Sequence, residues 1–112
     1  MTVQSEFTLT LPTQDQAVPP NALVVGQITQ LDFVVNGVTY VWPVPAATAV
    51  GATVTVLFAS LTPVFAPVAG TAYTADAFAV DANGNGVPSA SVAWTQVAAA
   101  TAPAAPTGFR VS

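Results

Sequence analysis

Residues 31–42, LDFVVNGVTYVW, are two strand-like runs joined by Asn36-Gly37, and this stretch constrains the fold more than any other. A type I′ turn needs positive φ at both central residues, which Asn-Gly adopts readily. The stretch therefore predicts a tight β-hairpin with one wholly apolar face. The residues expected to face one another on it are Leu31 and Trp42, Phe33 and Tyr40, and Val35 and Val38. A lone hairpin is marginal in water, so this face is expected to pack on a second sheet.

Composition argues against catalysis. The 112 residues include no cysteine and no histidine, which removes the thiol nucleophile and the usual general base and metal ligand. Asp76 and Asp81 are five residues apart, so on a continuous strand they lie on opposite faces and cannot form a paired-carboxylate site by themselves. We predict that the chain is not an enzyme and uses no cofactor.

Charge is scarce and limits the partners. Arg110 is the only cation against five acidic residues, giving a net charge of −4. Neutralising phosphates takes several Lys or Arg side chains, so neither nucleic acid nor an anionic membrane is an expected partner. Charged residues make up 5% of the chain, against about 25% on average. Part of the surface is therefore expected to be covered by another protein, the alternative being a monomer solvated by small polar residues.

The stretch from Phe33 to Ala75 contains no charged residue, as would be expected of a transmembrane segment. Gly51, Pro63 and Pro67 interrupt this segment, and residues 53–58 alternate as a strand does, so no span is predicted. The N-terminal MTVQSEFTLTL lacks the basic region and the continuous apolar run of a secretory signal. The expectation is synthesis in a cytoplasm without a signal peptide.

Alternating residues and turn signals predict an all-β fold without helices. Short strands are expected over residues 6–11, 22–27, 31–35, 38–42, 52–59, 71–81 and 89–97. Six to seven strands in this space predict a β-sandwich over residues 1–97. Residues 98–112, AAATAPAAPTGFRVS, predict an Ala/Pro-rich linker and a strand-like tail. The tail is expected to be free or bound to a partner, and folding back on an edge is the alternative.

Residues 70–94, GTAYTADAFAVDANGNGVPSASVAW, resemble the end of a fibronectin type III or related immunoglobulin-like module. The shared pattern is the Gly-Thr-x-Tyr entry, alternating small apolar residues, Ala-Val-Asp, a Gly-Asn turn and Pro-Ser before the last strand. The resemblance implies an immunoglobulin-like (fibronectin type III-like) sandwich. It also implies that the hydroxyl of Tyr73 bonds to upstream backbone.

Immunoglobulin-like modules that lack cysteine and a signal peptide, and are rich in Ala, Val and Thr, resemble those of bacteriophage virion proteins. The resemblance implies a structural protein located in the virion, as a capsid decoration or a tail-associated subunit. Its implied partners are capsid or tail subunits, including further copies of itself. The alternative is an adhesion or carbohydrate-binding module of a secreted or surface bacterial protein, with a glycan as partner.

One motif resembles part of a metal-binding loop. Asp81, Asn83 and Asn85 fit the opening D-x-N-x-N-G of a calcium loop, but the closing Glu position falls at Val92. A hairpin turn stabilised by Asx and Gly residues accounts for the same motif without a metal. No metal site is predicted, and these three residues remain a weak calcium candidate.

Two other sets of residues are expected to contact a protein partner. If Tyr73 points inward, Phe78 and Val80 are exposed on the opposite face of their strand, where Val34 and Val41 are expected to join them. The second set is Phe109 and Val111 in the tail. Aromatic residues in and near the hairpin suit either a sugar-binding platform or the core, and their cross-strand pairing favours the core. They are Phe33, Tyr40, Trp42, Tyr73 and Trp94.

Overall fold

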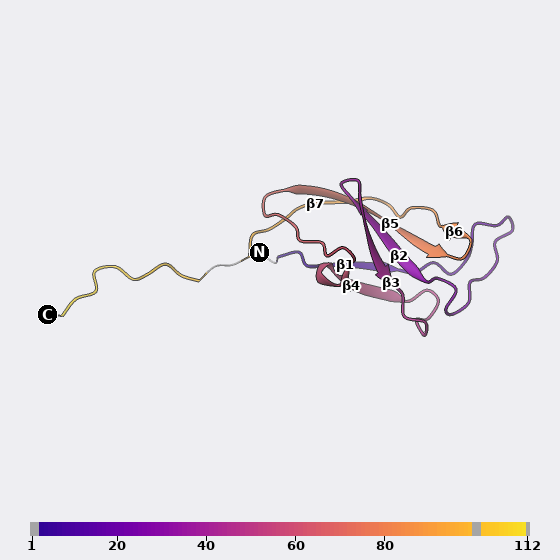
Figure 1. Ribbon diagram of the computed structural model, residues 1–112, viewed down its shortest axis with the longest axis horizontal. Helices are drawn as coiled ribbons and strands as arrows, with labels where there is room; N and C mark the ends of the chain where they lie inside the picture. Colours follow the sequence, from indigo (N-terminus) through magenta and orange to yellow (C-terminus); the bar gives the residue numbers. More distant parts are fainter. Residues whose placement is uncertain (1–2, 100–101, 112) are drawn as a thin grey trace.

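The computed structural model describes residues 3–99 and 102–111. In it the chain forms two antiparallel β-sheets (Figure 1). Within these residues there is no helix long and apolar enough to cross a bilayer. A short 3₁₀ turn, η1 (Phe58–Ser60), follows the fourth strand. The strands are β1 (Glu6–Thr10), β2 (Gln30–Val35), β3 (Val38–Pro43), β4 (Thr53–Leu57), β5 (Ala72–Asp81), β6 (Gly84–Asn85) and β7 (Val92–Thr95).

The two sheets have different sizes. β1 and β4 form a two-stranded sheet. In the larger sheet β2 lies between β3 and β5, and β5 pairs along its far edge with both β6 and β7. The predicted all-β sandwich is therefore confirmed, with a two-stranded layer on a five-stranded one.

The core lies between the sheets. Phe7 of β1 stacks on Phe33 of β2, with ring centroids 4.8 Å apart. The inward positions of both strands are apolar, with Phe7 and Leu9 in β1 packing against Leu31, Phe33 and Val35 of β2 in one core cluster. The buried apolar residues are Leu11, Leu31, Phe33, Val35, Val56, Phe58, Leu61, Phe65 and Ala75.

The predicted hairpin is confirmed pair by pair. Leu31 lies opposite Trp42, Phe33 opposite Tyr40 and Val35 opposite Val38. The turn residues Asn36 and Gly37 have φ values of 46° and 82°, as a type I′ turn requires.

The side chain of Asn36 ties this turn to the neighbouring strand. Its Oδ1 accepts a hydrogen bond from Thr74 N–H (2.9 Å), and its Nδ2 donates to the carbonyl of Ala72 (3.1 Å). The backbone N–H of Asn36 also donates to the Thr74 carbonyl (3.0 Å). The tip of the hairpin is thus fastened to β5.

The strand predicted over residues 22–27 is wrong, since only Ala22 forms an isolated bridge, to Gln14. Side chains and local turns take the backbone donors that a strand would use. Val24 N–H donates to Gln27 Oε1 (3.2 Å), and Gln27 N–H donates to the Val24 carbonyl (3.1 Å). The seventh strand is instead the two-residue β6, which pairs with the end of β5.

The C-terminal tail leaves the sandwich. Residues 102–111 form no strand, and all of them are exposed. Figure 1 shows them running away from the body, and the molecule measures 81 × 27 × 21 Å.

Candidate interaction surfaces

The outer face of the larger sheet carries the four residues predicted as an interface. Asp32 lies between Val41 and Phe78 across the sheet, while Val34 and Val80 lie in the rows on either side. Val34, Val41, Phe78 and Val80, hereafter the outer apolar set, are thus brought to one face. The expectation that Phe78 and Val80 are exposed is wrong, because both are half-buried, as are Val34 and Val41.

The carboxylates of Asp32 and Asp76 lie on the same face as the outer apolar set. Gln30 Nε2 donates to Asp32 Oδ1 (2.7 Å), and Ser91 Oγ donates to Asp76 Oδ1. Both donors are uncharged, so they do not neutralise the negative charge of this face. A partner that covers it has to bring apolar area together with a hydrogen-bond donor or a cation.

The tail presents the other predicted contact residues. Phe109 and Val111 are each 95% exposed. Arg110 lies between them, so the only cation of the chain is flanked by two large apolar side chains. The tail and the outer apolar set are separate surfaces in this structure.

The calcium candidate forms a tight hairpin. Asp81 pairs with Gly84, and Val80 pairs with Asn85, so the side chains of Asp81 and Asn85 lie on opposite faces of the ribbon. Asp81 Oδ1 accepts a hydrogen bond from Asn83 N–H (2.7 Å), which closes an Asx turn. In the part of the chain that the structure describes, no three acidic residues cluster as metal ligands. The structure does not bring the three candidate residues together around one point.

Calcium is therefore expected to leave the protein unchanged. A cation that binds only the folded state raises its melting temperature. We expect the melting temperatures in millimolar CaCl2 and in EDTA to agree within about 1 °C, as measured by circular dichroism. A rise of several degrees with CaCl2 that Asp81→Asn removes would contradict this prediction.

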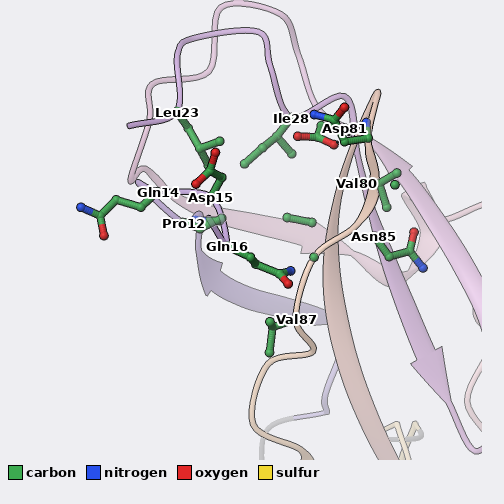
Figure 2. Close-up of a pocket in the computed structure, with 14 residues that line it drawn as sticks. Pro12, Gln14, Asp15, Gln16, Leu23, Ile28, Val80, Asp81, Asn85 and Val87 are labelled. Carbon is green, nitrogen blue, oxygen red and sulfur yellow. Dashed lines mark hydrogen bonds between the residues drawn. The ribbon is translucent and has the colours of Figure 1, made fainter. Parts of the chain in front are cut away.

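A cavity of about 480 Å³ lies beside this hairpin, between it and the loop of residues 12–28. Figure 2 shows Asp15 and Leu23 on the loop side and Val80 and Asp81 on the hairpin side. The Asp15 carboxylate is engaged in its own loop, because Oδ1 accepts from the N–H groups of Asn21 (2.8 Å) and Ala17 (3.0 Å) and Oδ2 accepts from Asn21 Nδ2 (3.0 Å). Asp15 therefore organises the wall of the cavity, and its oxygens already have partners.

Asp15 makes stability depend on pH. The hydrogen bonds from Asn21 N–H, then Asn21 Nδ2, then Ala17 N–H lower the pKa of Asp15 below its usual value. A lowered folded-state pKa contributes stability above the unfolded-state pKa, and this contribution is lost as pH falls through the folded value. We expect Asp15→Asn to lower the urea midpoint at pH 6 and to matter less at pH 3. An equal loss at both pH values would contradict the prediction.

The aromatic residues lie in the core and not on a platform. Trp94 stacks on Tyr73 (centroids 5.3 Å apart) and meets Phe7 edge to face (5.7 Å). Phe33 is 2% exposed, and Tyr40 and Trp42 are half-buried against the same cluster. The aromatic rings thus pack against one another and against the core, which supports the interpretation that they are core residues.

Two glutamines form a clasp that the sequence interpretation missed. Gln96, the only buried polar residue among those the structure describes, accepts from Trp94 Nε1 (3.0 Å) and donates to the Gln4 carbonyl (2.9 Å). Gln4 Oε1 accepts from Val97 N–H (2.9 Å). This glutamine clasp, Gln4 and Gln96, joins the start of β1 to the end of β7. Strand alternation that places Trp94 inward also places Gln96 inward, and this was the available signal.

The contact implied for Tyr73 is present. Val68 N–H donates to the Tyr73 hydroxyl oxygen (2.8 Å), five residues upstream. The ring packs edge to face against Phe65, with centroids 5.2 Å apart. The hydroxyl thus fixes the corner at which the chain enters β5.

Comparisons with known protein families, with curated proteins and with solved structures found no match to this chain.

Proposed function

We propose that this chain is a non-enzymatic structural protein of a bacteriophage virion, a capsid decoration or a tail-associated subunit. It acts by covering apolar surface against protein partners. The observation that supports this proposal is a surface rich in exposed large apolar side chains, in a chain with one cation and five acidic residues. Apolar surface of this kind usually marks an interface. These side chains include Val18, Val24, Val25, Val64, Val68, Val87, Phe109 and Val111.

The strand order supports an immunoglobulin-like module. In such sandwiches strands B and E are neighbours in one sheet, and G, F, C and C′ follow one another in the other. Here β1 lies beside β4, and the larger sheet runs β7, β5, β2, β3. The Tyr73 hydroxyl bond adds a second point of agreement. The virion setting itself rests on the resemblance to immunoglobulin-like modules of bacteriophage virion proteins, which lack cysteine and a signal peptide and are rich in Ala, Val and Thr.

The location is tested on particles. Peptide mass spectrometry of purified virions from the phage that encodes the chain should detect the chain, with a copy number in fixed ratio to the copy number of a capsid or tail protein. Absence from the particles would refute the virion role. Glycan binding that is lost in Trp42→Ala would instead support the adhesion or carbohydrate-binding module.

The contact surface is tested with charge substitutions. Phe78→Asp introduces a charge into the outer apolar set and is expected to reduce incorporation into particles, because a buried unpaired charge is costly. Thr55→Asp is the control, since Thr55 is an exposed strand residue of the smaller sheet and lies away from the outer apolar set. Incorporation unaffected by both Phe78→Asp and Phe109→Asp would overturn this surface assignment.

A further inference from the structure

The two-stranded sheet has an edge that the sandwich leaves open. Within residues 3–99 and 102–111, β1 pairs with no strand except β4. Leu11 N–H donates to the Ala52 carbonyl and Phe58 N–H to the Ser5 carbonyl, so the alternate residues Glu6, Thr8 and Thr10 direct their backbone groups away from β4. These groups form a row of donors and acceptors that suits an added strand.

A groove runs beside this edge and gives an added strand a place for its side chains. It measures about 210 Å³ and lies between the end of β1, the inner residues of β5 and the segment before β7. Engineered apolar cavities of about 150 Å³ take up benzene, so the groove has room for one phenyl ring. Its apolar walls are Leu9, Leu11, Leu31, Ala77, Ala79 and Val87.

The opposite edge of the small sheet is less open. After β4 the chain crosses to the larger sheet, where Thr62 exchanges two backbone hydrogen bonds with Val41 of β3 (2.9 Å each). Phe65, which follows, is buried in the core. The crossing segment closes the sandwich on the β4 side, which leaves the β1 side for a partner.

The tail matches the open edge in length, pattern and charge. Thr107–Val111 has five residues, as β1 has, and places Phe109 and Val111 on one face. Arg110 then falls on the other face. Glu6 is exposed on the outer face of β1 and is the only charged residue in β1 and β4. An added tail therefore sets a phenyl ring toward the groove and the only cation on the face that holds Glu6.

We infer that residues 107–111 of one copy add as a strand to the free edge of β1 in a second copy, with Phe109 in the groove. The inference rests on the proposed function and names a second copy as the partner. In the structure the tail runs away from its own body (Figure 1), which favours a neighbour over its own edge. Such a contact is head-to-tail, so repetition gives a ring or a filament.

Disulfide trapping tests this inference cleanly, because the chain has no cysteine. Full-length Arg110→Cys, which keeps Phe109 and Val111, is mixed with full-length Thr8→Cys or Thr10→Cys in a glutathione redox buffer. A bound tail holds the two thiols at high effective concentration, so the mixed dimer should exceed either homodimer by about tenfold. Mass spectrometry separates the three species.

The controls separate the alternatives. Thr39→Cys places an exposed thiol on the larger sheet and should give mixed dimers only in the statistical proportion. Adding Phe109→Asp to the Arg110→Cys chain should remove the excess of mixed dimer over homodimers. A chain with both Thr8→Cys and Arg110→Cys should form covalent oligomers, while a disulfide-closed monomer would overturn the inference. Equal trapping by Thr55→Cys on β4, or only statistical trapping throughout, would overturn it as well.

Failure of the tail-to-β1 contact and failure of the virion role give different results. Statistical trapping together with presence in particles removes only the tail-to-β1 contact. Trapping at Thr8 or Thr10 together with absence from particles removes only the virion proposal.

Discussion

Phe33→Ala is expected to lower the free energy of unfolding by about 3–5 kcal/mol. Phe33 is 2% exposed, and its ring stacks on Phe7 of the opposite sheet. Removing it leaves a cavity at the point where the two layers touch, and its neighbours in the sheet, Tyr40 and Ala77, are held by strand pairing and cannot fill it. Since small domains are stable by about 5–15 kcal/mol, this variant should lose a substantial part of its stability.

Urea denaturation followed by tryptophan fluorescence measures the effect. Phe78→Ala is the matched control, because Phe78 is a half-buried phenylalanine of the same sheet on its outer face. We expect that variant to lose about 1 kcal/mol. Equal losses for the two variants would contradict the assignment of inner and outer faces.

Asn36→Ala is expected to lower the free energy of unfolding by about 2–4 kcal/mol, because it removes two hydrogen bonds and places a Cβ-bearing residue with no local hydrogen bond at positive φ. The bonds are those from Thr74 N–H to Asn36 Oδ1 and from Asn36 Nδ2 to the Ala72 carbonyl. The φ of Asn36 is 46°. Loss of this side chain should loosen the hairpin tip from β5.

Asn36→Gly separates the two causes. Glycine accepts positive φ without strain, so this variant should lose only the hydrogen bonds, about 1–2 kcal/mol. Amide exchange of Thr74, followed by NMR, should accelerate in both variants. An Asn36→Ala protein as stable as the parent would show that the turn and its link to β5 contribute little.

The parts of the fold that local chemistry decides were predictable. Asn36-Gly37 specifies one turn, the turn fixes the register, and the register places Leu31, Phe33 and Val35 inward. Strand alternation also predicted which face of β5 carries Phe78 and Val80. It did not predict that both are half-buried, because the exposure of a strand residue depends on which residues of the paired strands lie beside it, here Asp32 and Gln30 of β2.

The parts decided by distant or side-chain partners were missed. Residues 22–27 have strand-forming Val24 and Val25, but the Gln27 side chain and local turns take the backbone donors there. The glutamine clasp joins residues 92 positions apart, and nothing local in the sequence specifies such a pair. Periodicity reports which face a residue occupies and not which residue it meets.

The glutamine clasp has a mechanical consequence. Gln4 precedes β1, and Val97, at the root of the tail, donates its N–H to Gln4 Oε1. Tension on the tail therefore reaches the start of β1 and the end of β7 together, through Gln96 and the Trp94 ring behind it. A pull on the tail is therefore shared from the outset between β1 of the smaller sheet and β7 of the larger one.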